Sequence, residues 1–236
     1  MTLRIKNLTF SYEKGNVIND LSLELKSGST TALIGSSGSG KTTLLKLITG
    51  LLNPIAGSIQ INGTASYLMQ ENTLLPWRTV DEHLTLIAEF QNVEIDKYER
   101  QELLRLLGLG GKEHQYPHQL SGGMKRRVSF AQAILRDHSL LLMDEPFSSL
   151  DVHTREQLFK LLKIIQEKNR STVLIVTHDY RDAITVADEI LWLNDGSIGN
   201  RWNVDDAIRQ DPSRSGHLLN TIRQGTYAAM DRSSLG

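Results

Sequence analysis

The chain has 236 residues, a formal net charge of -1 and no cysteine. This length suits one large domain, or a core with a small insertion, and the near-neutral charge argues against nucleic-acid binding, which needs a basic excess. The lack of cysteine excludes disulfides and thiolate metal sites, and it suits a reducing compartment.

Two alternating apolar patterns open the chain. Residues 3–10 alternate apolar and polar side chains with one slip at Asn7, and residues 21–25 repeat the alternation more cleanly. We predict two half-exposed antiparallel strands. Tyr12 is expected in the loop between them, either as an ordinary edge aromatic or as a stacking surface for a nucleotide base, and its spacing favours neither.

A glycine-rich motif follows the next strand. Thr30–Ile34 is a short apolar, β-branched run that predicts a buried parallel strand, and Lys41–Ile48 predicts a helix. Between them, Gly35-Ser36-Ser37-Gly38-Ser39-Gly40-Lys41-Thr42 fits the phosphate-binding loop of many NTPases. The alternative is a flexible linker, but a linker would not stand between a buried strand and a leucine-bearing helix.

The chemistry of this loop suits a nucleoside triphosphate. Glycines permit a positive φ, so successive backbone N–H groups can turn inward around a phosphate. The helix that begins near Gly40 adds its positive N-terminal end. Lys41 brings a full positive charge to the β and γ phosphates, and the Thr42 hydroxyl can bind Mg²⁺.

The middle of the chain predicts two more strands and a helical insertion. Strands are expected at Ser58–Ile61 and Ser66–Met69, and the second delivers Gln70 to its end, where a glutamine is usually only a polar strand terminus. Residues 74–118 look like a separate helical insertion, whose first helix starts with a capping box. The box is formed by Thr79 and Glu82, and a second helix is expected from about 96 to 107.

Two further patterns carry polar groups at the ends of elements. Leu120-Ser121-Gly122-Gly123 is a second glycine-rich helix start, with Ser121 as the N-cap, and alone it is a weak anion-binding signal. Leu140–Met143 predicts a buried strand that ends in Asp144 and Glu145. Burying charged carboxylates there costs free energy unless a cation binds them or a reacting water needs them. We therefore predict that Asp144 binds Mg²⁺ and that Glu145 activates the attacking water, rather than that both simply lie at a solvated strand end.

The last third of the chain is less informative. An amphipathic helix follows Asp151, and a buried strand at Thr172–Val176 leads to His178, a residue that is more often structural but here lies beside the predicted site. Glu189–Leu193 with a following Asp-Gly turn predicts a closing hairpin. The polar residues beyond about Asn200 allow no prediction.

The order of these motifs resembles the ABC transporter ATPases. The Leu-Ser-Gly-Gly segment (120–123) shortly before an apolar strand ending in Asp-Glu is highly specific once a phosphate loop precedes it. The resemblance reaches about Asn200. It implies a single α/β domain over 1–236, a P-loop NTPase core with an antiparallel β subdomain and a small helical subdomain at 74–118.

The resemblance also implies a division of roles. Two copies, or this chain and a paralogous ATPase, would close head to tail around ATP. Gln70 would then lie near Mg²⁺ and the attacking water, His178 near the γ-phosphate, and Tyr12 would stack on adenine. The implied catalytic residues are Glu145, His178 and Gln70, and the implied Mg²⁺ ligands are Thr42, Gln70 and Asp144. The implied ATP-binding residues are Tyr12, Gly35, Ser36, Ser37, Gly38, Ser39, Gly40, Lys41, Thr42, Thr43, Ser121, Gly122, Gly123 and Asp151, the last within Ser149-Leu150-Asp151.

Within the family, residues 74–80 look like the nitrate/sulfonate/taurine importers, and Met124 and the Asp-Glu-Pro-Phe run at 144–147 also suit that group. Two positions depart from the family pattern. Arg126 stands where glutamine is usual, and Gln132 stands where arginine is usual. Both lie on the helix after the signature segment, so we expect nucleotide closure to be tuned differently here.

The resemblance implies partners as well. No apolar run is long enough to span a bilayer and no signal-peptide core is present, so the permease is expected to be a separate protein, docked on the helical insertion at the cytoplasmic face of the inner membrane. A solute-binding protein would act indirectly, and no nucleic acid is expected. A soluble ABC ATPase acting on nucleic acid or ribosomes usually has long coiled-coil insertions or two cassettes, and a small-molecule kinase would not need the signature segment.

Overall fold

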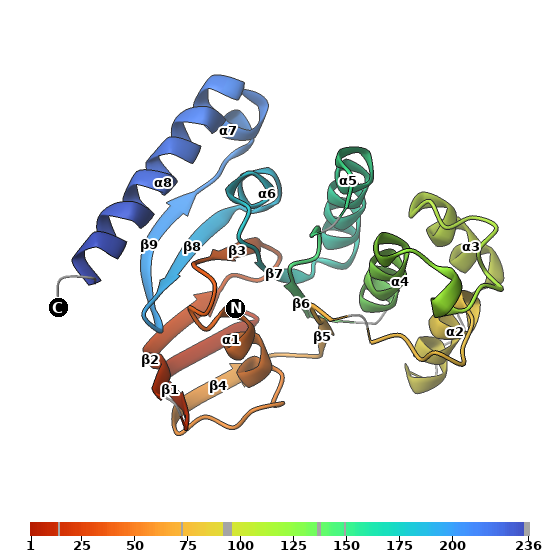
Figure 1. Ribbon diagram of the computed structural model, residues 1–236, viewed down its shortest axis with the longest axis horizontal. Coiled ribbons are helices and arrows are strands. Elements are labelled where there is room, and N and C mark those ends of the chain that lie inside the picture. Colours follow the sequence, from red (N-terminus) through yellow and green to blue (C-terminus); the bar gives the residue numbers. More distant parts are fainter. Residues whose placement is uncertain (14, 72, 92–95, 136–137, 149, 234–236) are drawn as a thin grey trace. The chain divides into compact units, whose positions relative to one another are not determined.

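The computed structural model describes residues 1–13, 15–71, 73–91, 96–135, 138–148 and 150–233 (Figure 1). The chain divides into two compact units, which we describe separately. Unit 1 combines Met1–Asn62 with Thr172–Gly236, and unit 2 is Gly63–Ser171. The boundaries expected for a helical subdomain, 74–118, stay a prediction.

An antiparallel sheet of three strands opens unit 1. Its order is β2 (Gly15–Leu25), β1 (Leu3–Tyr12) and β4 (Ala56–Ile61). The predicted slip at Asn7 is a real irregularity, because this residue has a φ of 47° and the β1–β2 register shifts around it. The placement of Tyr12 in a loop was wrong: it is the last residue of β1 and pairs with Gly15, since β2 begins well before its apolar alternation.

The second sheet portion of unit 1 surrounds the strand that leads into the glycine-rich motif. β3 (Thr30–Ile34) lies between the parallel strands β7 (Thr172–Val176) and β8 (Glu189–Asn194), and β9 (Ser197–Asn203) closes the predicted hairpin with β8. All residues of β3 and β7 are buried, as their unbroken apolar and β-branched sequences predict. Helices α1 (Lys41–Ile48) and α6 (Tyr180–Val186) follow β3 and β7.

The C-terminal region, for which the sequence allowed no prediction, is helical. It forms α7 (Asp206–Gln210) and α8 (Pro212–Ser233). Figure 1 shows α8 in blue beside β9. Ile222 is fully buried in a cluster with Ile34 and Trp192, and Leu218 and Leu219 pack against the same cluster. A few apolar side chains on an otherwise polar helix thus attach it to unit 1.

Unit 2 combines two parallel strands with four of the described α-helices. β5 (Ala65–Leu68) runs parallel to β6 (Leu140–Asp144), and the helices are α2 (Val80–Gln91), α3 (Lys97–Leu106), α4 (Gly122–Leu135) and α5 (Val152–Asn169). A short 3-10 turn, η1 (Pro117–Gln119), precedes α4, which packs against α2 and α3. The predicted capping box is present, because Thr79 N–H donates to Glu82 Oε2 at 2.6 Å and Glu82 N–H donates to Thr79 Oγ1 at 3.3 Å.

In the portions of the chain that the structure describes, none of the helices combines the length and apolarity needed to cross a bilayer.

The burial of Ile222 predicts that α8 contributes to stability. Because Ile222 is 0% exposed, Ile222→Ala should lower the free energy of unfolding by about 2–4 kcal/mol, from lost burial and the cavity left behind. Urea unfolding followed by circular dichroism would measure the change. Ile164→Ala is the matched control, because Ile164 on α5 is 59% exposed and should change stability by less than about 0.5 kcal/mol. Equal unfolding midpoints for the two variants would contradict the docking of α8.

Candidate functional site

The glycine-rich loop of unit 1 is held across its span by Lys41. The buried Lys41 ammonium donates to the carbonyl oxygens of Gly35 at 2.9 Å and Ser36 at 2.7 Å. Gly38 and Gly40 have φ values of 82° and 98°, in the left-handed region that favours glycine. A Cβ on Gly40 would also lie 3.0 Å from Val17, so β2 leaves little space for a side chain there.

The same loop fits a phosphate group. Helix α1 starts at Lys41, so the N–H groups of its first turn have no acceptor within the helix and point toward the loop. Among the described residues, the buried Ser39 Oγ has no hydrogen-bond partner. An anion in the loop would meet these donors and the Lys41 charge, and Thr42 and Thr43 lie in the same first turn.

Two more predicted residues, His178 and Tyr12, belong to unit 1. Val176 of β7 pairs with Leu33 of β3, so the exposed His178 follows at the edge where the glycine-rich loop begins. Tyr12 ends β1 with an exposed ring that packs edge-on against Phe10, with centroids 4.9 Å apart. The role of Tyr12 in base stacking and that of His178 at a γ-phosphate stay predictions.

The second set of predicted residues lies together in unit 2. Leu68 of β5 pairs with Met143 of β6, so Gln70 follows its strand at the same edge as Asp144 and Glu145. Asp144 is 1% exposed and Glu145 is 9% exposed. Glu145 also has a φ of 50°, which is uncommon for a residue with a side chain and often accompanies a functional position.

Two residues that the sequence analysis did not assign to the site contact this strand end. The Tyr67 hydroxyl lies 3.5 Å from Asp144 Oδ2, and burial, followed by the negative charge of Asp144, raises the pKa of Tyr67. Tyr67 therefore stays a neutral hydrogen-bond donor. The Arg126 guanidinium donates to backbone carbonyls on both sides of the edge. The sequence had marked Arg126 only as a departure from the family pattern.

The Leu-Ser-Gly-Gly segment begins α4 as predicted. Met124 N–H donates to Ser121 Oγ at 3.2 Å, which confirms Ser121 as the N-cap. Ser121 and Gly122 are exposed to solvent in unit 2, so another molecule can reach the N-terminus of α4. Binding of a nucleotide by this segment stays a prediction.

Asp151 has a structural role that the sequence analysis missed. Its carboxylate caps α5 by accepting from Thr154 N–H at 2.9 Å and Thr154 Oγ1 at 2.7 Å. The backbone hydrogen bond and then the hydroxyl hold the pKa of Asp151 below its usual range. Its expected place at the nucleotide stays a prediction, and Ser149 lies outside the described residues.

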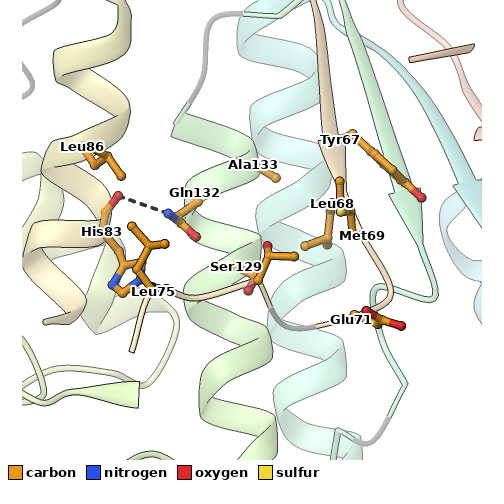
Figure 2. A pocket seen from close by; sticks show the side chains of 11 residues that line it. Tyr67, Leu68, Met69, Glu71, Leu75, His83, Leu86, Ser129, Gln132 and Ala133 are labelled. Atoms are coloured by element: carbon orange, nitrogen blue, oxygen red, sulfur yellow. Dashed lines mark hydrogen bonds between the residues drawn. The ribbon is translucent and has the colours of Figure 1, made fainter. Parts of the chain in front are cut away.

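A pocket of about 230 Å³ lies beside α2 and α4 in unit 2 (Figure 2). Gln132 Nε2 donates across it to the His83 carbonyl at 3.2 Å. His83 Nε2 accepts from Leu75 N–H at 2.8 Å, so Nδ1 carries the ring proton and faces the Thr79 carbonyl at 2.7 Å. Burial lowers the pKa of His83, which favours this neutral form. His83 thereby fixes residues 75–79, which carry the 69% exposed Trp77.

The predicted Mg²⁺ ligands Thr42, Gln70 and Asp144 are a hydroxyl, an amide and a carboxylate. No group of three or more His, Cys, Asp or Glu within the described ranges is arranged to hold a metal ion. Thr42 belongs to unit 1, whereas Gln70 and Asp144 belong to unit 2. Mg²⁺ commonly takes only one or two carboxylates and completes its shell with water and phosphate oxygens. The residue types of the predicted set, a hydroxyl, an amide and one carboxylate, are compatible with Mg²⁺ ligation, and their joint role stays a prediction.

Comparison with known proteins identifies relatives along most of the chain. The profile of the ABC transporter family matches residues 18–148. The chain is 40% identical over 211 residues to the aliphatic sulfonates import ATP-binding protein SsuB 1 of Paracoccus denitrificans, covering 89% of this chain and 86% of that protein. It is 37% identical over 200 residues to the SsuB of Bacillus subtilis, covering 80% of this chain and 78% of that protein.

Solved structures agree with these sequence matches. An ATP-binding subunit of an ABC transporter is 31% identical, with a TM-score of 0.80 over 89% of this chain and 93% of that chain. A dimeric ATP-binding cassette in a post-hydrolysis state, bound to ADP and Pi, is 28% identical, with a TM-score of 0.79 over 86% of this chain and 99% of that chain.

The contacts of Lys41 predict how its loss would act. Lys41→Ala removes the only full positive charge of the glycine-rich loop, so it should abolish detectable ATP hydrolysis, a loss of about 10²–10³-fold or more, and sharply weaken ATP binding. Phosphate release and equilibrium binding of a fluorescent ATP analogue would measure the two effects. Lys46→Ala is the control, since Lys46 is an exposed lysine on the same helix. Hydrolysis near the wild-type rate in Lys41→Ala would refute the phosphate-loop assignment.

Proposed function

The chain belongs to the ABC transporter family as an ATP-binding and ATP-hydrolysing subunit, and we propose that it powers solute import through a separate permease, with Mg²⁺ as its metal. The observation that carries the hydrolytic part is the strand end of unit 2. There, Glu145 follows Asp144 on the same sheet edge as Gln70. The Glu145 side chain is buried, and its backbone has a left-handed conformation. Lys41 and the first turn of α1 in unit 1 are the groups that we propose to bind the phosphates.

The proposed reaction is attack of water on the γ-phosphorus. Glu145 takes a proton from the water while the water oxygen forms a bond to the γ-phosphorus. The bond between the γ-phosphorus and the β–γ bridging oxygen breaks, which gives ADP and phosphate. Lys41 and the first-turn N–H groups of α1 stabilise the charge on the phosphate oxygens, and Gln70 and His178 orient the water and the γ-phosphate. Thr42, Gln70 and Asp144 would hold Mg²⁺, which supplies positive charge to the phosphates.

We further propose that two copies close head to tail. Ser121, Gly122 and Gly123 of one copy would meet the ATP held by the glycine-rich loop of the other. The open N-terminus of the fourteen-residue helix α4 supports this contact, because helix N-termini favour phosphate. The similar cassette solved with ADP and Pi is a dimer, which also supports it.

The surface around residues 74–80 is proposed as the permease contact. Trp77 is 69% exposed, which argues against the alternative that it packs inside the helical insertion, and an exposed aromatic beside Arg78 suits an interface anchor. The pocket in Figure 2 lies next to it and is lined by Leu75, Leu86 and Met69, the residue before Gln70. A permease segment bound there would be adjacent to the backbone that carries Gln70.

Docking on a permease would place the subunit at the cytoplasmic face of the cell membrane. A solute-binding protein on the opposite side of the membrane would act on it only indirectly, through the permease. The solute is chosen by those two partners. Because relatives at 37–40% identity are named for the import of aliphatic sulfonates, an aliphatic sulfonate is the solute to test first.

Glu145→Gln should bind ATP but scarcely hydrolyse it. Glutamine keeps the size of the side chain but cannot accept the proton, and loss of a general base typically lowers the rate about 10²–10⁴-fold. Removing the carboxylate also reduces repulsion of the γ-phosphate, so the variant should accumulate as a dimer with ATP. Phosphate release and size-exclusion chromatography with ATP, in the presence of either Mg²⁺ or Na⁺, would test both effects. Full activity in Glu145→Gln would rule out its role as the base.

Ser121→Arg in the Glu145→Gln background tests the head-to-tail arrangement. A large cation at the start of α4 should block the contact of the signature segment with the opposite nucleotide, so the double variant should elute as a monomer. Arg105→Ala is a suitable background control, because Arg105 is an exposed residue of α3 that pairs locally with Glu102. A dimer whose elution depends neither on ATP nor on Ser121→Arg would contradict the head-to-tail arrangement.

Trp77→Ala should uncouple transport from hydrolysis. The exposed ring contributes little to folding, so stability and basal ATP hydrolysis should stay within about twofold of wild type while solute uptake falls at least about tenfold. Uptake in cells or proteoliposomes with the cognate permease would measure this. Tyr98→Ala is the matched control, since Tyr98 is 68% exposed on α3 outside residues 74–80. Unfolding of Trp77→Ala, or normal uptake, would refute the contact.

A further inference from the structure

We propose that Arg126 is a positioning residue for hydrolysis, which ties the segment carrying Gln70 to the strand end carrying Asp144 and Glu145. This inference rests on the proposed function, in which those three residues act on the water and the metal. It concerns a position where this chain departs from the family pattern, because arginine replaces the usual glutamine.

The geometry of Arg126 is that of a clamp between two backbone segments. Its Nη1 donates to the carbonyl of Met69 and, at 3.0 Å, to the carbonyl of Gln70. Its Nη2 donates to the carbonyl of Asp144 and, at 3.0 Å, to the carbonyl of Glu145. Each terminal nitrogen thus binds one side of the edge, and one side chain of helix α4 links the two segments.

This arrangement requires a guanidinium. A planar guanidinium offers five N–H donors in a fixed fork, whereas a glutamine amide offers two. Arg126 is 4% exposed, and a buried cation is costly unless its donors are paired and opposite charges lie near it. Burial lowers the pKa of Arg126, while the carboxylates of Asp144 and Glu145 oppose that shift. The four carbonyls pair the two terminal nitrogens and the two carboxylates offset the positive charge, whereas Nε has no hydrogen-bond partner among the described residues.

One of the carbonyls that Arg126 holds belongs to Glu145, whose backbone conformation is unfavourable for a residue with a side chain. Glu145 has a φ of 50°, a conformation that persists only where the surroundings hold it. Its carbonyl accepts from Arg126 Nη2 at 3.0 Å, from Ser148 Oγ at 2.9 Å and from Ser148 N–H at 3.2 Å. Fixing this carbonyl fixes the direction of the Glu145 side chain, and the same guanidinium holds the backbone of Gln70.

Removal of the fork should impair catalysis more than ATP binding. Arg126→Met keeps most of the side-chain length without any donor, so kcat should fall about 10²-fold as the carboxylate and Gln70 lose their alignment. The Kd for ATP should change less than about threefold, because Lys41 and the glycine-rich loop are untouched. Arg126→Gln keeps two donors and should recover part of the loss, with kcat about 10-fold below wild type.

A second readout does not depend on activity. Hydrogen–deuterium exchange should show that amides around 69–71 and 144–148 lose protection together in Arg126→Met, and to a smaller degree in Arg126→Gln. Arg100→Met is the matched control, because Arg100 is another poorly exposed arginine of unit 2, paired at 3.1 Å with Asp81, and its loss should leave kcat and both segments unchanged.

The outcomes separate this inference from the proposed function. A fall in kcat at constant Kd, partial recovery with glutamine and joint loss of protection support the clamp. A folded Arg126→Met with kcat within twofold of wild type, a parallel loss of kcat and ATP binding, or unchanged exchange overturns it. If Arg126→Met does not fold, Arg126→Gln decides by the same criteria. A wild-type protein that does not hydrolyse ATP would refute the proposed function, while the exchange data would still test the clamp.

Discussion

The site depends on a property of parallel strands, whose carboxyl ends meet at one edge of a sheet. In unit 1 the pairing of Leu33 with Val176 puts the start of the glycine-rich loop and His178 at one edge. In unit 2 the pairing of Leu68 with Met143 does the same for Gln70, Asp144 and Glu145. Polar residues separated by many positions in the chain are therefore brought together by buried apolar strands that have no chemistry of their own.

A second theme is the use of buried cations against backbone carbonyls. Lys41 spans the glycine-rich loop through the carbonyls of Gly35 and Ser36, and Arg126 spans the strand end of unit 2 through four carbonyls. In both cases the cation fixes the backbone by donating to carbonyl oxygens. Each cation thus holds one backbone segment of its own unit, and we propose that Lys41 in addition offers its charge to a phosphate.

The sequence predicted those parts of the fold that depend on local patterns. The buried strands, the capping box of Thr79 and Glu82 and the N-cap Ser121 follow from residues a few positions apart, and all are present. Tyr12 was misplaced because pairing with Gly15 extends β1 beyond its apolar alternation. Helix α8 was not predicted, because the apolar residue that attaches it, Ile222, packs against a cluster around Trp192 that a local pattern does not reveal. The role of Arg126 was also out of reach, since its carbonyl partners lie 57 residues before it at Met69 and 18 residues after it at Asp144.

The central claim is that water activated at this strand end attacks the γ-phosphorus of ATP. Single-turnover hydrolysis in water enriched in ¹⁸O, followed by mass spectrometry of both products, tests it most directly. The account predicts one ¹⁸O atom in the released phosphate and none in ADP, with formation of labelled phosphate depending on the Glu145 carboxylate. Label in ADP, or transfer of the phosphoryl group to an acceptor without labelled phosphate, would contradict it.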